Sequence, residues 1–295
     1  MRQTKFAAIE EEKKYISPET IFHYTSTAGL MGIITNDELW FSRFDCLNDI
    51  QEGVYIHKPY QEAIRQLQGE VEASFLELMM QFAPNYKEYF RSGPIEKDGS
   101  CLVTPKDSIP YLCCFSTDGD SLPMWNYYSK SGRYEGYNIE FDWKKIKEDH
   151  KELEELCVIY EEHDQMAILK NMIKEALVNY KNNGLEWIWL YYTRELMTHA
   201  LEFKNPAYRH ESEVRLVYKR PENDDGLAEK ALELAFRQTQ GLVIPYVKIK
   251  GIKEAIKSVT IGPLINQNVA ENTLNCLMKE GITVPIKQSA VPIRY

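Results

Sequence analysis

The sequence lacks a long hydrophobic run. In its 295 residues no apolar stretch approaches the roughly 18 residues that suggest a membrane helix. The first residues are charged, MRQTKFAAIEEEKKYISPE, and contain no apolar run of signal-peptide length. We therefore expect a cytoplasmic protein with no membrane partner.

Positive charge is also in short supply. The chain has 35 lysines and arginines against 44 aspartates and glutamates, a formal net charge of −9. A broad electrostatic attraction to nucleic acid is therefore not expected, because such binding depends on neutralising phosphates. Local basic patches remain open, with one candidate group at Lys248, Lys250, Lys253 and Lys257.

Cysteine is sparse and lacks metal-ligand spacing. The six cysteines include no CxxC pair, and Cys113 and Cys114 are adjacent, which rarely suits a structural disulfide or a tetrahedral zinc site. We interpret all of them as reduced core residues: Cys46, Cys101, Cys113, Cys114, Cys157 and Cys276. No bound metal is expected.

Several catalytic motifs are missing. The sequence contains no HExxH, no P-loop, no GxGxxG and no GxSxG nucleophile elbow. His210 and Glu211 form only the first half of a zincin motif, because no histidine follows four residues after His210. Four common classes of enzyme therefore lose support.

The hydrophobic spacing predicts one α+β domain over residues 1–295. Helical segments at about 61–82 and 165–201 are expected as additions to the sheet core, and 258–287 has the order of a βαβ unit. Residues 91–108 are expected to be an exposed connection. Strands are predicted at 21–25, 39–42, 111–116, 136–142, 156–161, 212–219, 242–249, 258–262 and 282–287, with shorter helices at 28–34, 124–130 and 268–279.

The segment HESEVR, residues 210–215, places charges at alternate positions. In a strand, Glu211, Glu213 and Arg215 would project to one face. Two neighbouring carboxylates repel, so one has a raised pKa, or Arg215 or a ligand holds the pair. The alternative is a solvated strand face with cross-strand ion pairs.

Two aromatic positions and one histidine are equally ambiguous. Trp125 and Tyr128 lie three residues apart, on one side of a predicted helix, which is typical of core packing but also suits a cationic ring stacked on an aromatic face. His23, between Phe22 and Tyr24, is either a hydrogen-bonded strand end or a residue that contacts a ligand.

An ordered set of short motifs carries a resemblance. FHYTS, GLMGI and ELWFS are followed by LND, CFS, MWNYYS, GYNIEF, HESEVRLVY, VTIGP and the terminal SAVPIRY. From about residue 20 onward, this order resembles a widespread bacterial family catalogued only as a domain of unknown function. That resemblance implies no activity.

The order of histidine, aromatic residue and acid also resembles, more distantly, the His-Tyr-Glu arrangement of ADP-ribosyltransferases. The resemblance implies an ADP-ribosyltransferase-like fold with mixed or antiparallel sheets, and NAD as the substrate. It implies that His23 contacts the adenosine ribose, with Thr25 or Ser26 beside it. Tyr128, or its neighbour Tyr127, would stack on nicotinamide.

The catalytic glutamate implied by this resemblance is Glu213, with Glu211 as the competitor for the role. A carboxylate can stabilise the oxocarbenium character that develops when the nicotinamide–ribose bond breaks. We expect a protein that transfers ADP-ribose to an unknown macromolecular acceptor or hydrolyses NAD, in keeping with a bacterial stress or phage-defence role.

Two other functions stay open. The same residues can line the pocket of a non-enzymatic module that binds a small ligand or a protein. A third hypothesis is a nuclease or other hydrolase with a divalent metal on hard oxygen ligands, drawn from Asp45, Asn48, Asp49 and Glu52.

Overall fold

The computed structural model of the protein describes residues 18–81, 109–129, 134–220, 231–239, 241–279 and 281–293. In this part of the chain, helices surround one large, mostly antiparallel sheet, so the predicted α+β class is confirmed. The strands are β1 (Thr20–Thr25), β2 (Glu38–Arg43), β3 (Ile109–Ser116), β4 (Tyr137–Asp142), β5 (Leu153–Cys157), β6 (Glu213–Arg220), β7 (Leu234–Thr239), β8 (Leu242–Lys250), β9 (Ile256–Ile261) and β10 (Ile286–Gln288).

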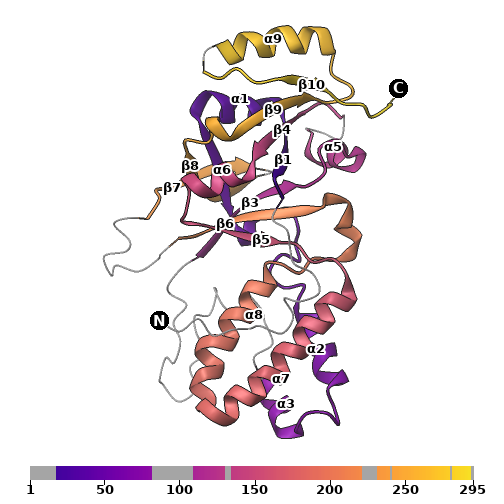
Figure 1. Ribbon diagram of the computed structural model, residues 1–295, viewed down its shortest axis with the longest axis vertical. Coiled ribbons are helices and arrows are strands. Elements are labelled where there is room, and N and C mark those ends of the chain that lie inside the picture. Colours follow the sequence, from indigo (N-terminus) through magenta and orange to yellow (C-terminus); the bar gives the residue numbers. More distant parts are fainter. Residues whose placement is uncertain are drawn as a thin grey trace.

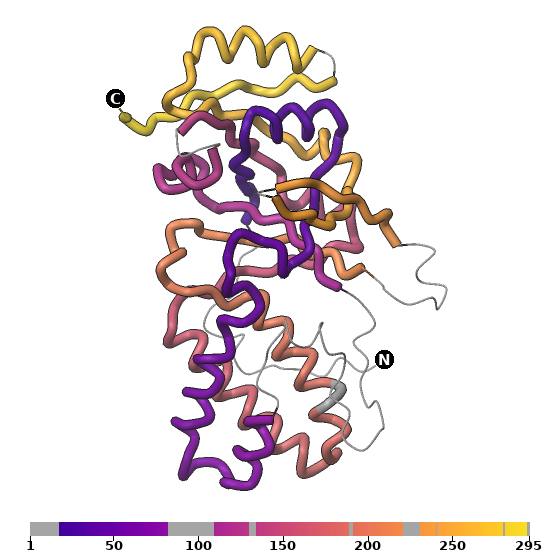
Figure 2. Tube along the Cα trace, turned by 180° about the vertical axis from the view of Figure 1, so that it is seen from behind, coloured from indigo at the N-terminus to yellow at the C-terminus, as the bar shows by residue number. Residues whose placement is uncertain are grey.

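The helices divide into two groups (Figure 1). One group lies around the sheet: α1 (Thr27–Asn36), α5 (Leu122–Tyr128), α6 (Trp143–Asp149) and α9 (Gln267–Lys279). The other forms a helical layer beyond β5 and β6, also visible from behind in Figure 2: α2 (His57–Gln66), α3 (Ala73–Met80), α7 (Glu162–Trp187) and α8 (Thr193–Ala200). The helical layer matches the predicted additions to the sheet.

The sheet forks at β3. The main path runs β10-β9-β4-β1-β3-β2-β8-β7, and β6 joins β3 and carries β5. Along one edge β3 pairs with β6 over its whole length. Along the other edge it pairs with β2 at Tyr111 and Leu112 and with β1 at Ser116. Strands β1 and β2 therefore diverge around Cys113, Cys114 and Phe115, which creates space between them.

The predicted helix over 61–82 is wrong as a single element. The structure breaks it into α2 and α3, because Gly69 adopts φ +87°, a left-handed conformation that glycine accepts readily. A small bridge between Gln68 and Val71 completes the turn. The apolar periodicity nevertheless predicted correctly which face of these helices is buried, since Ile64, Phe75 and their neighbours are buried.

Other predicted elements need smaller corrections. The strand expected at 156–161 begins earlier, at Leu153, and ends at Cys157. Strand β7, which no prediction included, forms a hairpin with β8. The βαβ prediction for the C-terminal part is confirmed, because β9 and β10 pair in parallel on either side of α9. The predicted connection at 91–108 lies outside the described residues.

The cysteine prediction is correct only in part. Each described cysteine is a free thiol, but Cys113 alone is fully buried and Cys276 on α9 is exposed. Two lysines of the predicted basic patch have acidic neighbours, since Lys248 pairs with Glu38 and Lys257 lies near Glu140. Among the described residues, no helix is long and apolar enough to cross a membrane.

Candidate active site

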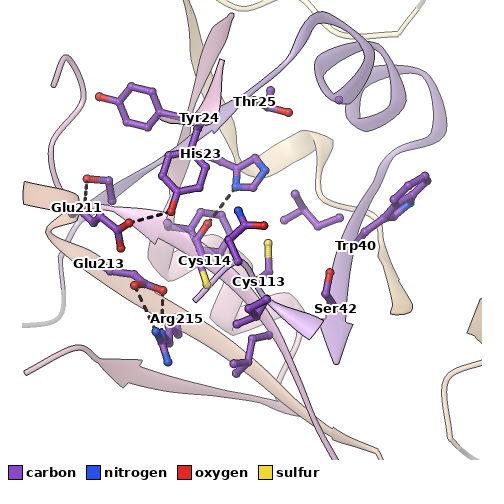
Figure 3. A pocket seen from close by; sticks show the side chains of 18 of the residues that line it. His23, Tyr24, Thr25, Trp40, Ser42, Cys113, Cys114, Glu211, Glu213 and Arg215 are labelled. Atoms are coloured by element: carbon purple, nitrogen blue, oxygen red, sulfur yellow. Dashed lines mark hydrogen bonds and ion pairs between the residues drawn. The ribbon is translucent and has the colours of Figure 1, made fainter. Parts of the chain in front are cut away.

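A cavity of about 650 Å³ occupies the space where β1 and β2 diverge from β3. Residues from β1, β2, β3, α5 and the start of β6 line it (Figure 3). Its wall includes every site residue predicted from the sequence: His23, Thr25, Ser26, Tyr127, Tyr128, Glu211 and Glu213. Its size falls in the range typical of small-molecule sites.

His23 projects from β1 into the fork. Its Nδ1 lies 3.0 Å from the carbonyl oxygen of Cys114 on β3. A carbonyl only accepts, so Nδ1 carries the hydrogen and, in the neutral ring, Nε2 is an acceptor. Burial lowers the pKa of His23, and the nearby Arg237 charge lowers it further, so the ring is neutral at pH 7. The site thus contains an oriented acceptor.

Thr25 and Ser26 belong to the turn from β1 into α1. The Ser26 hydroxyl accepts a hydrogen bond from the Gly29 backbone N–H at 3.2 Å and caps the helix. A side chain at position 29 would displace the Thr25 hydroxyl, because a Cβ there would come within 2.0 Å of Thr25 Oγ1. Both hydroxyl residues border the cavity, and Ser26 also fixes the start of α1.

The two candidate tyrosines have different surroundings. Tyr127 is 62% exposed, and its ring lies 5.3 Å from that of His210. Tyr128 is half-buried against the small cluster that contains Trp125, and its hydroxyl donates to Glu211 at 3.0 Å. Tyr128 therefore joins the acidic side of the cavity, whereas Tyr127 faces largely outward.

Helix α5 is held in place by a buried tyrosine on β1. The Tyr24 hydroxyl donates to the carbonyl of Asp118 and accepts from the Ser121 N–H, each at 2.9 Å. Its ring meets Trp125 edge-on at 4.9 Å. Trp125 thus has the core role that its helical spacing suggests, while Tyr128, one turn later, reaches the cavity.

Glu211 and Glu213 do not share one strand face, as the alternation predicted. Strand β6 starts at Glu213, whereas Glu211 ends a 3₁₀ turn, η4 (Pro206–Glu211), and Ser212 between them has φ 45°. The left-handed residue turns the chain and interrupts the alternation. The two carboxylates still converge, because the ammonium of Lys204 bonds to both.

Lys204 and Arg215 connect three buried carboxylates into one network. Arg215 binds Glu213 through Nε at 2.8 Å and Glu52 through Nη1 at 2.6 Å, while Lys204 binds Glu213 at 2.6 Å (Figure 3 shows the Arg215–Glu213 pair). With all three carboxylates ionised, the three acids and two cations leave an excess of one negative charge at this wall of the cavity.

The network separates the pKa values of the two candidate glutamates. Burial acts to raise the pKa of Glu213, but the charges of Arg215 and Lys204 outweigh it and hold that pKa below its usual range. Burial raises the pKa of Glu211, with Lys204 opposing. Glu213 is thus the permanently ionised member of the pair, and Glu211 is the one that takes up a proton more readily.

Sequence reasoning missed Lys204 and Arg237, and it placed Glu52 in a metal site. Instead, Glu52 pairs with Arg215, Asp45 pairs with Arg43 at 2.6 Å, and Asp49 accepts from the Gln51 N–H. A lysine just after an amphipathic helix carries no signal for burial. The neighbouring charges of Glu211, Glu213 and Arg215 were the only signal for a network here.

Comparison with known proteins finds a match to one family model over part of the chain. The family described as "Protein of unknown function (DUF2971)" matches residues 124–216, from α5 to the middle of β6. This confirms the resemblance to a domain of unknown function over a segment that contains Tyr128, Lys204, Glu211 and Glu213. A search of the curated proteins gave no match.

Proposed function

We propose that this chain is an ADP-ribosyltransferase-like protein that binds NAD and either transfers ADP-ribose or hydrolyses NAD. One observation carries the proposal: a single cavity brings His23, Tyr128 and Glu213 together from three distant segments of the chain. Three unrelated core positions would be expected on separate faces. Their convergence supports the roles that the resemblance to ADP-ribosyltransferases implies.

The charge at the acidic wall suits the cationic end of NAD. The network there has one negative charge in excess, and the ring of Tyr128 borders the same space. A positively charged nicotinamide ring would gain from both the carboxylates and the aromatic face. We assign Tyr128 to the ring and the Nε2 acceptor of His23 to a ribose hydroxyl.

Glu213 would stabilise the charge that develops during bond cleavage. When the N-glycosidic bond breaks, its electron pair leaves with nicotinamide, which becomes neutral, and positive charge spreads over the ribose. An ionised carboxylate fixed by Arg215 and Lys204 opposes that charge without reorganising. An oxygen of water or of an acceptor then bonds to the ribose carbon and releases one proton, for which Glu211 is the available base.

A second function, binding without turnover, is favoured by one specific feature. Both oxygens of Glu213 already have cationic partners, with Arg215 on Oε1 and Lys204 on Oε2. A carboxylate so fully paired has less capacity to stabilise charge on a ligand. On this alternative, the cavity binds a nucleotide-like ligand and the acidic network is structural.

Nicotinamide release by the wild-type chain and by Glu213→Gln tests the two functions. We expect calorimetric NAD binding by both proteins and a loss of release of about 10²- to 10³-fold in the variant. Glu254→Gln is the matched control, because its side chain is 82% exposed and does not line the cavity. Binding without release by the wild type favours the binding module, and no binding by the folded protein rejects both.

A further inference from the structure

Arg237 on β7 borders the same cavity. Unlike Lys204 and Arg215, it is not paired with a carboxylate among the described residues. It is half-buried, its Nη2 donates to the Ser42 hydroxyl at 2.7 Å, and its buried Nε has no hydrogen-bond partner. Among the residues that the structure describes, no carboxylate lies within ion-pairing distance of Arg237. Its guanidinium instead lies 5.7 Å from the ring centre of Trp40 and 5.8 Å from that of Tyr246.

Glu38, a carboxylate at the start of β2 that also lines the cavity, is already engaged. Glu38 accepts from Trp40 Nε1 at 2.8 Å and pairs with Lys248 at 3.4 Å. Stacked aromatic rings hold Arg237 in place, since Trp40 and Tyr246 lie 4.4 Å apart with an interplanar angle of 29°. The sheet thus orients a guanidinium toward the cavity and supplies no anion for it.

The position of Arg237 is separate from the acidic network. Figure 3 shows Trp40 and Ser42 on the other side of His23 from Glu211 and Glu213. Ser42 pairs with Leu112 on β3, whereas Glu213 pairs with Ser116, four residues further along that strand. Four residues of strand span about 13 Å. The cavity therefore has an acidic end and a basic end, with the neutral imidazole of His23 between them.

We propose that Arg237, with Ser42 and the Trp40 ring, forms a subsite that binds the phosphate groups of a nucleoside diphosphate. This Arg237 subsite rests on the proposed function in one respect, that the ligand's other end is the nicotinamide riboside half of NAD. A planar guanidinium carries several N–H donors for phosphate oxygens, and the one contact with a protein acceptor that the structure gives for Arg237 is the bond from Nη2 to Ser42. The spacing of the two ends selects a ligand with a cationic ring and a diphosphate, rather than a nucleoside.

Titration of wild type and Arg237→Gln with three probes tests the subsite. Inorganic pyrophosphate and NAD both carry the diphosphate, whereas nicotinamide riboside carries only the cationic ring and its ribose. We expect the variant to lose about 10- to 100-fold in affinity for the first two, the range for a charged hydrogen-bonding group, and to keep its affinity for nicotinamide riboside. Arg237→Lys, which keeps the charge but lacks the planar donors, should recover part of the loss.

Arg65→Gln is the matched control, since Arg65 lies on α2 and does not line the cavity. Equal affinity of wild type and Arg237→Gln for pyrophosphate and NAD would overturn the subsite, and would mean that Arg237 serves only the aromatic stack. The two proposals fail separately. If NAD is cleaved equally well by wild type and Arg237→Gln, the proposed function is supported and the subsite is not. If pyrophosphate binding depends on Arg237 but no nicotinamide is released, the subsite is supported and the proposed function is not.

Discussion

The hydroxyl of Tyr128 donates a 3.0 Å hydrogen bond to Oε1 of Glu211, which joins helix α5 to the turn before β6. This contact links the aromatic and acidic parts of the site. It also gives Tyr128 two separable features, a ring that borders the cavity and a hydroxyl that stabilises the ionised form of Glu211.

Substitutions at Tyr128 can separate the ring from the hydroxyl. Tyr128→Phe keeps the ring and loses one hydrogen bond, so we expect NAD affinity to fall by less than about tenfold. Tyr128→Ala removes the stacking surface as well and should cost more than about tenfold. Calorimetry measures both, and thermal unfolding checks that each variant is folded. Equal losses in the two variants would mean that the ring does not contact the ligand.

The titration of Glu211 predicts how NAD binding depends on pH. Because burial raises the pKa of Glu211, this carboxyl takes up a proton at a higher pH than an ordinary glutamate. Protonation removes the excess negative charge at the acidic wall. NAD affinity should therefore fall as the pH is lowered from neutral through the raised pKa of Glu211, and affinity for ADP-ribose, which lacks the cationic ring, should fall less.

Glu211→Gln is the control for this pH dependence, because an amide cannot titrate in that range. Its NAD affinity should be low at neutral pH and should change less with pH than that of the wild type. Parallel curves for NAD and ADP-ribose in the wild type would contradict a role for the acidic wall in binding the cationic ring.

Arg215 is the residue on which stability of the network depends. Its side chain is 1% exposed and pairs with both Glu52 and Glu213. Arg215→Gln leaves these carboxylates buried without their main cation, so we expect a loss of about 3–5 kcal/mol in the free energy of unfolding. Urea unfolding measures it, with the exposed Arg65→Gln as a control that leaves the midpoint unchanged.

The stability of the protein at low pH should also report on the Arg215–Glu213 pair. The pKa of Glu213 lies below its unfolded value, so its contribution to stability is present at neutral pH and is lost as the pH falls through the native pKa. The raised pKa of Glu52 has the opposite effect, because protonation of this carboxyl at low pH adds to the free energy of unfolding. In Arg215→Gln the Glu213 contribution should be missing, and its acid-side loss of stability should be smaller than that of the wild type.

Local patterns predicted most of the sheet and drew attention to several residues that line the cavity. Alternating apolar residues predicted β4 and β6, and the His23 strand end and the charges around Glu213 were visible in single short segments. These features depend on neighbours within a few positions of each other, which is what periodicity and turn chemistry report.

Contacts between distant segments had no such signal. Arg237 reaches Ser42, and Arg215 reaches Glu52, across 195 and 163 positions. In the sequence, nothing distinguishes Arg237 or Glu52 from an ordinary surface charge. The break at Gly69 shows that a local pattern can also mislead. The apolar periodicity continues across the turn, so the sequence predicted one helix where the backbone conformation gives two.

Substitutions at His23 can separate its structural hydrogen bond from its role in ligand binding. In His23→Asn the side-chain amide can still donate to the Cys114 carbonyl in place of Nδ1, but it has no group at the position of Nε2. We expect unfolding stability close to the wild type and a loss of NAD affinity of about tenfold. His23→Ala should lose the same affinity and also about 1 kcal/mol of stability, because the Cys114 carbonyl loses its partner. Calorimetry and urea unfolding on the two variants measure each quantity, and an unchanged NAD affinity in His23→Asn would show that the imidazole only closes the fork between β1 and β3.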